Sequence, residues 1–463
     1  MKKKVENLHK MLYYYIIGGF IMNEIIKIFN ETKKHNEIPN ELYSKYGVKK
    51  GLRNEDGTGV LIGLTKICDV VGYKIIDDKK IDQEGKLYYR GYNLNDICDN
   101  MRTDFVYEEV AYLILFGKLP TSEQLESFKK ILAENYQLPD GFISQYILRY
   151  PSMNVMNKMQ RALLMLYSED ENADDTSVEN TLKQGISILA KLPSIAVYAY
   201  QSKNHFFNDE SLYIHHIDVG VSIAENILRL LRPNKKYLPE EVKILDLLLV
   251  VHLDHGSGNN STFANSVIAS TNTDIYSSFS GSIGSLKGTK HGGANITCLK
   301  MMNTIINEIG LDASDEKIKT VINKLLDKQF FDGSGLIYGM GHAVYTISDP
   351  RAMVIKHEAI KLAKIKNQEL RLDFYIRFEA LTKEIIMERK NMNICSNVDY
   401  YTGLVYNMLD IPEDLFTPLF VISRSCGWIA HNIENKLYSN RIIRPAGRYV
   451  GELYDYVKME DRK

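Results

Sequence analysis

Several features that mark particular protein classes are missing from this sequence of 463 residues. Its 57 Lys and Arg residues nearly match its 58 Asp and Glu residues, so the net charge of -1 offers no general attraction for nucleic acid or an anionic membrane. The five cysteines are scattered and contain no C-x-x-C pair, which predicts reduced thiols and a cytoplasmic location. No internal repeat, low-complexity tract or Pro-rich linker occurs. An ordinary globular protein whose binding sites are local is therefore expected.

The N-terminus holds one stretch that resembles a signal peptide. Lys2 to Lys4 precede an apolar segment from Met11 to Met22. No small-residue cleavage site of the A-x-A kind follows, and the segment is shorter than the roughly 20 residues that a spanning helix needs. We therefore expect no membrane insertion, and Met22 is a candidate alternative start of translation.

Helical patterns prevail after residue 93. The periodicity of Phe105 to Phe116 predicts a helix that stops at Gly117, and the capping box from Thr121 to Gln124 opens the next one. The stretch from Val242 to Leu253 is apolar on almost every face, so it predicts a helix in the centre of a large core. Between residues 59 and 92, β-branched and aromatic residues predict a few short strands. The fold class is therefore mainly α.

Four of the eleven histidines lie in segments flanked by glycines. His252 and His255 precede a glycine-rich run, His291 opens His-Gly-Gly-Ala-Asn, and His342 ends Gly-Met-Gly-His. Glycine lets backbone or ligand approach closely, and the helix expected after His291 would present an open N-terminus to an anion. Each histidine taken alone is more simply a core or turn residue, but the group points to a site.

A second group of residues could recognise carboxylates. Arg351, Arg424, Arg441 and Arg444 provide the fork-shaped donors that bind carboxylates bidentately, although a lone arginine usually lies in a surface ion pair. Asp399 stands among apolar and aromatic neighbours, where burial would raise its pKa and make it a stronger base. By itself this aspartate would be read as a helix cap.

Six segments, taken in order, resemble the citrate synthase family. They are HLDHGSGNNST, GSLKGTKHGGAN, GMGHAVYTISDPRA, NVDYYTGLVY, FTPLFVISRSCGWIAH and RIIRPAGRYVG, within a resemblance from about Gly51 to Tyr454. Local spacings agree as well, with nine residues from His342 to Arg351 and twenty from Arg424 to Arg444. The resemblance implies a si-type enzyme that condenses acetyl-CoA with oxaloacetate and water to give citrate and CoA.

The resemblance also implies a role for each matching residue. Asp399 corresponds to the base that removes a proton from the acetyl methyl group. His291 stabilises the enol or enolate, and His342 polarises the carbonyl of oxaloacetate. The carboxylates of oxaloacetate would be bound by His255, Arg351, Arg424 and Arg444. The last of these reaches the site of the partner subunit in the family, so a homodimer is expected.

The sequence departs from the family on the side where CoA is expected to bind. Bacterial members often have Arg-Val-Tyr-Lys after the carbonyl-polarising histidine, whereas this chain has Ala-Val-Tyr-Thr from Ala343 to Thr346. The residues expected to contact CoA are Lys290, Tyr338, Gly339, Met340, Gly341 and Lys390. Acetyl-CoA is a co-substrate in this reading, and neither a permanently bound cofactor nor a metal is expected.

The domain organisation also follows from the resemblance. Residues 51–293 and 411–463 are expected to form a large helical domain, after an N-terminal segment at 1–50. Residues 294–410 would form a smaller inserted helical domain that closes over oxaloacetate and excludes water.

Three alternatives remain open. A 2-methylcitrate synthase would use propionyl-CoA with the same acid and base groups, and one methyl group changes discrimination by only about 1–3 kcal/mol. A metal hydrolase could use His252, His255 and His291 as ligands, but no H-E-x-x-H pattern accompanies them. A non-enzymatic scaffold would predict loss of Asp399 or of the two main histidines, which are all present.

Overall fold

The computed structural model describes residues 26–33, 37–54, 57–76, 79–100, 103–439 and 441–462. The segment from Met11 to Met22, with its candidate start, lies outside these residues. The chain divides into two compact units. One unit comprises residues up to Val60 together with those from Arg444 onward, and it contains helix α2 (Glu41–Lys45) and the short helices η2 (Lys50–Leu52) and η6 (Met459–Asp461). The other unit is Leu61–Ile443.

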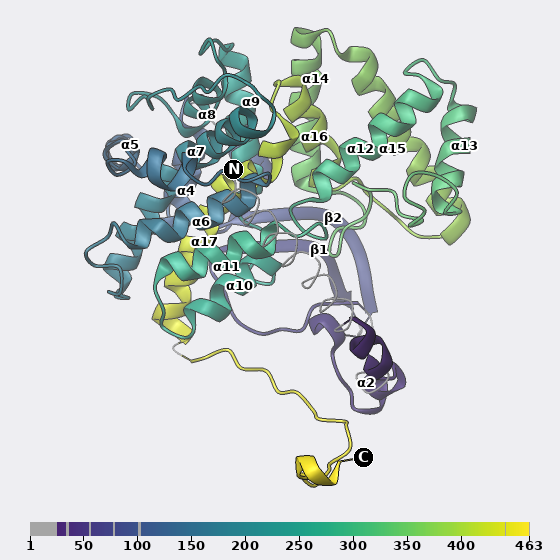
Figure 1. Cartoon of the computed structure of the whole chain (residues 1–463). Coiled ribbons are helices and arrows are strands. Elements are labelled where there is room, and N and C mark those ends of the chain that lie inside the picture. The colour runs from purple at the N-terminus through teal and green to yellow at the C-terminus, as the bar shows by residue number, and fades with distance from the viewer. Residues whose placement is uncertain are drawn as a thin grey trace, which may run out of the picture. The chain divides into compact units, whose positions relative to one another are not determined.

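The larger unit is mainly helical, which confirms the predicted fold class (Figure 1). Its helices are α3 (Leu94–Asn100), α4 (Val106–Phe116), α5 (Ser122–Asn135), η3 (Ile143–Leu148), α6 (Val155–Tyr167), α7 (Val178–Phe207), α8 (Ile223–Leu231), α9 (Pro239–His252), α10 (Asn260–Ala269), α11 (Ile275–Leu286), α12 (Ala294–Ile309), α13 (Asp315–Leu326), α14 (Pro350–Lys366), α15 (Glu369–Lys390), α16 (Val398–Met408), η4 (Glu413–Leu415), α17 (Phe416–Glu434) and η5 (Asn435–Ser439). Within the described residues, no helix is long and apolar enough to cross a membrane.

The local signals for the first helices are confirmed. Helix α4 ends at Gly117, which adopts the left-handed conformation with φ of 81°. Helix α5 begins with the predicted capping box, in which the Thr121 side chain accepts from the Gln124 backbone and the Gln124 side chain accepts from the Thr121 backbone. Short-range chemistry therefore sets these boundaries.

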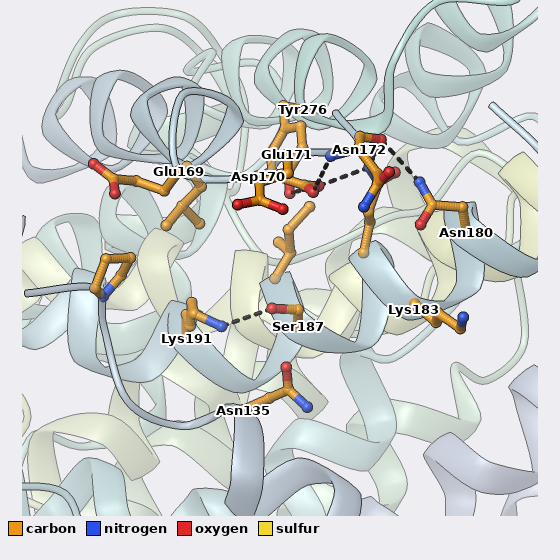
Figure 2. A pocket seen from close by; sticks show the side chains of 14 residues that line it. Asn135, Glu169, Asp170, Glu171, Asn172, Asn180, Lys183, Ser187, Lys191 and Tyr276 are labelled. Carbon is orange, nitrogen blue, oxygen red and sulfur yellow. Dashed lines mark hydrogen bonds between the residues drawn. The ribbon is translucent and has the colours of Figure 1, made fainter. Parts of the chain in front are cut away.

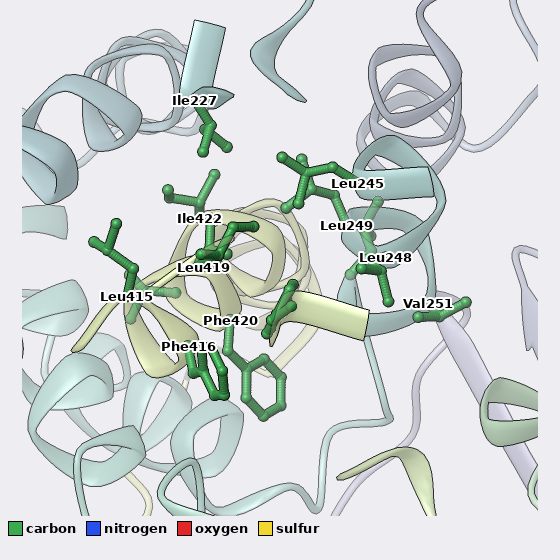
Figure 3. Packing of buried hydrophobic residues seen from close by; sticks show 14 of the residues in the cluster. Ile227, Leu245, Leu248, Leu249, Val251, Leu415, Phe416, Leu419, Phe420 and Ile422 are labelled. Carbon is green, nitrogen blue, oxygen red and sulfur yellow. The ribbon is translucent and has the colours of Figure 1, made fainter. Parts of the chain in front are cut away.

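The core that supports the site is formed by α9 and α17. Helix α9 is buried over most of its length, as its all-round apolar sequence predicts, and α17 is buried from Phe416 to Asn432. Figure 3 shows leucines of α9 facing Leu419, Phe420 and Ile422 of α17, with Ile227 of α8 beside them. Since α9 ends at His252 and α17 carries Arg424 in its middle, polar groups are embedded at the centre of this core.

The predicted strands form a small antiparallel sheet. Strands β1 (Cys68–Ile76) and β2 (Lys79–Tyr89) make a long hairpin, and β3 (Tyr92–Asn93) adds two residues to its edge. Two hairpin glycines touch the loop after His342: a Cβ at Gly72 would collide with the Val344 carbonyl, and one at Gly85 with the Ser348 carbonyl. Glycine is required at both positions because backbone lies against backbone there.

Helices α12 to α16 lie together beside this hairpin (Figure 1). Helix α16 packs between α12 and α14, while α15 contacts α13 and α14. These helices occupy the range expected for the smaller, inserted domain, and the division into a large and a closing domain stays a prediction.

Candidate active site

A buried arginine with unsatisfied donors lies in the core of the larger unit. Arg424 is 0% exposed, its Nε donates to the carbonyl of His252 at 2.7 Å, and its guanidinium lies 4.7 Å from the centre of the Phe420 ring. Neither Nη1 nor Nη2 has a hydrogen-bond partner among the described residues. Burial lowers the pKa of Arg424, but guanidinium remains charged in proteins. Two parallel donors left unpaired in a dry site fit a carboxylate.

A second arginine converges on His342. Arg351 opens α14 after Asp349, the helix N-cap, and donates from Nε and Nη2 to that carboxylate at 3.0 and 2.7 Å. Its Nη2 also lies 3.5 Å from Nε2 of His342. The aspartate occupies one edge of the guanidinium, so Nη1 and the second Nη2 proton are left for another acceptor.

The backbone around His342 determines which ring nitrogen carries the proton. The amides of Val344 and Tyr345 both point at Nδ1, at 3.1 and 3.2 Å, so Nδ1 accepts and the neutral ring is protonated on Nε2. Nε2–H and the Arg351 guanidinium are then two donors that face each other at 3.5 Å. An oxygen acceptor near this pair could accept a hydrogen bond from each.

His255 and Tyr345 complete this side of the cluster. The His255 ring lies edge-on to His342 with centroids 5.1 Å apart, and the Tyr345 ring stacks on His342 at 4.7 Å. Nε2 of His255 is buried without a partner among the described residues. Burial, followed by the charges of Arg351, His342 and Arg424, keeps the pKa of His255 well below its usual value. His255 is therefore a neutral ring that can form a hydrogen bond to a ligand.

His291 lies at the open N-terminus of α12. Its Nε2 is 3.2 Å from Oγ of Ser261, and its ring lies 6.2 Å from that of Phe420. The N-cap of α12 is Gly293, which offers no side-chain cap, so the helix end is open to an anion as predicted. Burial, and then the charge of Arg424, lowers the pKa of His291 to about 4. The ring is neutral at physiological pH.

Asp399 lies in the first turn of α16. Its backbone amide donates to the N-cap side chain of Asn397 at 3.0 Å, which leaves the carboxylate itself outside the cap. Burial raises the pKa of Asp399 to about 6, the charge of Arg351 opposes this shift, and that of Asp349 adds to it. A carboxylate with this pKa is a base suited to neutral pH.

Hydrogen bonds join the loop before His342 to the segment before Asp399. The Gly341 amide donates to the Cys395 carbonyl at 2.7 Å, and Asn397 donates its backbone and side-chain N–H groups to the carbonyls of Gly339 and Gly341, both at 2.8 Å. Gly339 and Gly341 have φ of +82° and +89°, which explains the glycines of this motif. The two catalytic candidates are thus carried by adjacent, bonded segments.

The structure places six of the seven predicted catalytic and carboxylate-binding residues in the larger unit. His255, His342 and Arg351 are in contact, and Phe420 links Arg424 to His291. Electrostatic interactions connect Arg424 with both His255 and His291, and Arg351 with Asp399. Arg444 belongs to the other unit and is exposed.

The residues expected to contact CoA are only partly near this cluster. Gly339 to Gly341 belong to the loop just described, and the Tyr338 hydroxyl donates to Asp332 at 2.6 Å. Lys290 and Lys390 are exposed, the first beside His291 and the second at the end of α15. Their role stays a prediction.

Several residues around the site were missed by sequence reasoning. Asp349, Tyr345, Phe420 and Ser261 are the contacts that orient Arg351, His342, Arg424 and His291. The Asp-Pro-Arg order was a usable signal for Asp349, because Asp at the N-cap and Pro at the first helical position are typical of a helix start. Tyr345 and Phe420 are also close in sequence to the residues that they contact, three residues after His342 and four before Arg424 on α17, whereas Ser261 meets His291 only through tertiary packing.

A separate pocket of about 440 Å³ lies away from the catalytic candidates (Figure 2). It is lined by α6, α7, the loop after α6 and Tyr276 of α11. Asp170 accepts from Gln184 and from the Tyr276 hydroxyl, both at 2.8 Å, and Lys191 donates to Ser187 at 2.6 Å. None of the predicted site residues lines this pocket.

His252, one of the three histidines considered as metal ligands, has other contacts. Nδ1 of His252 contacts the Leu248 carbonyl at 2.8 Å, and its ring packs edge-on against Phe420. Across the described parts of the chain, no three His, Cys, Asp or Glu side chains are grouped as metal ligands. The metal-hydrolase alternative therefore has no site in those parts.

Comparison with known proteins agrees with this geometry. The family model for the citrate synthase C-terminal domain matches residues 55–446. The chain belongs to the citrate synthase family. A citrate synthase of Haloferax volcanii is 32% identical over 423 residues, which cover 90% of this chain and 99% of the relative. The chain is accordingly an enzyme of the citrate synthase type.

Two further relatives of this family member bear on substrates. A 2-methylcitrate synthase of Shewanella oneidensis is 35% identical over 369 residues, covering 79% of this chain and 88% of the relative. Citrate synthase from Thermoplasma acidophilum, solved as a ternary complex with carboxymethyl coenzyme A and oxaloacetate, has a TM-score of 0.73 and 26% identity. That alignment covers 90% of this chain and 99% of the Thermoplasma chain.

Proposed function

We propose that the enzyme condenses acetyl-CoA with oxaloacetate and water, releasing citrate and CoA. The observation that carries the proposal is a group of donors on neighbouring side chains: the unpaired Nη groups of Arg424 and Nε2 of His255, together with Arg351 and His342, whose nitrogens lie 3.5 Å apart. These donors match two carboxylates and one carbonyl, which are the acceptors of oxaloacetate.

The same groups suggest the order of chemical steps. Asp399 removes a proton from the acetyl methyl group while neutral His291 donates a hydrogen bond to the thioester oxygen. The N–H group of a neutral imidazole can stabilise the thioester oxygen by this hydrogen bond as the oxygen gains negative charge. The new carbon nucleophile attacks the carbonyl carbon of oxaloacetate, and the carbonyl oxygen receives the Nε2 proton of His342. Water then cleaves citryl-CoA to citrate and CoA.

We further propose that the enzyme acts as a cytoplasmic homodimer in which Arg444 completes the partner's site. Arg444 is exposed, so a second chain can reach it. Residues 294–410 carry His342, Arg351 and Asp399, and their closure over oxaloacetate would exclude water before the enolate forms. Lys290, Lys390 and the loop from Tyr338 to Gly341 are the proposed contacts for CoA.

The test is release of free thiol from acetyl-CoA in the presence of oxaloacetate, by the wild type and by Asp399→Asn. The variant keeps the shape of the side chain but cannot act as the base, so we expect kcat to fall by about 10²–10⁴-fold. An unchanged melting temperature would show that the fold is intact. A folded wild type that releases no thiol would refute the proposal.

A 2-methylcitrate synthase is the second candidate, because the relative from Shewanella oneidensis is as similar to this chain as the citrate synthases are. Propionyl-CoA in the same assay separates the two activities. A higher kcat/KM for propionyl-CoA than for acetyl-CoA would establish the second candidate, with the same residues in the same roles.

A further inference from the structure

A buried carboxylate outside the catalytic cluster gathers four donors. Glu379, in the middle of α15, is 5% exposed. Its Oε1 accepts from Lys383 at 2.6 Å and from the Ser396 hydroxyl at 2.8 Å. Its Oε2 accepts from the Tyr401 hydroxyl at 2.5 Å and from Lys356 at 2.9 Å. Burial by itself would raise the pKa of Glu379, but the hydrogen bonds from Lys383, Tyr401 and Lys356 outweigh burial and lower it to about 2.

Three of the four donors belong to the segments that carry catalytic candidates. Ser396 stands three residues before Asp399, and Tyr401 stands two residues after it. Lys356 lies on α14, whose first turn carries Arg351. Glu379 therefore forms hydrogen bonds to residues before and after Asp399 in the sequence, and also to α14, the helix that carries Arg351.

Because of helix geometry, these hydrogen bonds also determine the direction in which Asp399 points. Residues two apart on an α-helix point about 200° apart around its axis. Since the Tyr401 side chain points from α16 to Glu379 on α15, Asp399 points to nearly the opposite side. Holding the Tyr401 hydroxyl at a fixed point thus fixes the rotation of the first turn, and the Ser396 bond fixes the chain that enters it.

We infer that Glu379 is a positioning residue for the base: its bonds to Ser396 and Tyr401 hold the first turn of α16 at the rotation that aims Asp399 at the acyl methyl group. The expected effect on catalysis rests on the proposed function, whereas the anchoring of α16 can be measured whether or not that function is correct. A displacement of about 1 Å at a catalytic group lowers the rate by about 10²-fold.

The test compares Glu379→Gln and Tyr401→Phe with the control Lys383→Met. Lys383 shares the carboxylate but lies on α15 itself, so its loss removes charge and leaves the bonds to α16 intact. We expect Glu379→Gln to lower kcat by about 10–100-fold with the oxaloacetate KM within about threefold of wild type. Tyr401→Phe should lower kcat in the same direction, the double variant should be no worse than Glu379→Gln, and the control should stay within about twofold.

Hydrogen exchange of the backbone amides in the first turn of α16 provides the second measurement. Faster exchange is expected in Glu379→Gln and Tyr401→Phe than in Lys383→Met. The inference is wrong if kcat of Glu379→Gln stays within twofold of wild type, if the control loses as much, or if exchange in this turn is unchanged. An inactive wild type would instead refute the proposed function, and exchange alone would then decide whether Glu379 anchors the helix.

Discussion

Replacing Arg424 with methionine should separate stability from function. In the unliganded protein the guanidinium is fully buried with both Nη groups unpaired, and each unsatisfied group costs about 1–3 kcal/mol. Methionine fills a similar length without donors, although the His252 carbonyl loses the Nε bond, at a cost in the same range of about 1–3 kcal/mol. The difference predicts a variant whose free energy of unfolding is unchanged or raised by about 1–3 kcal/mol.

The same substitution should abolish binding of oxaloacetate. Two charge-assisted hydrogen bonds to one carboxylate contribute about 1.5–3 kcal/mol each, so their loss predicts a drop of about 10²–10⁴-fold in kcat/KM for oxaloacetate. At 100 times the dissociation constant, oxaloacetate should stabilise the wild type by about 2.7 kcal/mol and Arg424→Met hardly at all. Thermal unfolding with and without oxaloacetate measures both effects, and Arg149→Met, an exposed arginine, is the control.

The reasoning fails in either of two cases. In the first, Arg424→Met still gains stability from oxaloacetate with an affinity within tenfold of wild type. In the second, the unliganded variant loses more than about 2 kcal/mol, which would mean that the buried guanidinium stabilises the fold.

Three further predictions concern the base and the loop that carries His342. Below about pH 6, kcat/KM for oxaloacetate should fall tenfold per pH unit, because Asp399 must lose its proton to act as a base. The corresponding acid limb of the kcat profile should lie at a higher pH, since oxaloacetate is then bound. Gly85→Ala should lower kcat at least tenfold and destabilise by about 1–3 kcal/mol, since its Cβ would strike the Ser348 carbonyl; Gly63→Ala, with open space around it, should do neither. Tyr345→Phe should leave the melting temperature unchanged or higher, because the hydroxyl that it removes is buried without a partner among the described residues. An identical acid limb in both profiles, an active Gly85→Ala or a clearly less stable Tyr345→Phe would contradict the respective argument.

The sequence was most informative where structure depends on nearby residues. Gly117, the Thr121 capping box and the apolar run of α9 each specify an element through local chemistry, and all three are confirmed. The roles assigned to Asp399, His291 and His342 came from the resemblance to a family, and no local rule would have produced them.

What the sequence could not reveal are contacts between distant segments. Glu379 lies in the middle of an ordinary helical pattern, and only folding brings it to Tyr401. Gly85 reads as an interruption of a strand, although the structure requires it because the Ser348 carbonyl lies against it. Such residues carry no periodic or motif signal, since their partners are far away in the chain.

In the proposed mechanism, the electrostatics of the cluster couple oxaloacetate binding to the strength of Asp399 as a base. Before substrate binds, the charge of Arg351 holds the pKa of Asp399 below the value that burial would give it. A substrate carboxylate paired with Arg351 would offset that charge and so raise the pKa of Asp399 further. A base is most effective when its pKa lies near the working pH, because it is then strong while a substantial fraction of it is still deprotonated. Acetyl-CoA that binds after oxaloacetate would thus meet a stronger base than acetyl-CoA that binds first. This charge effect favours proton removal when the electrophile is already bound.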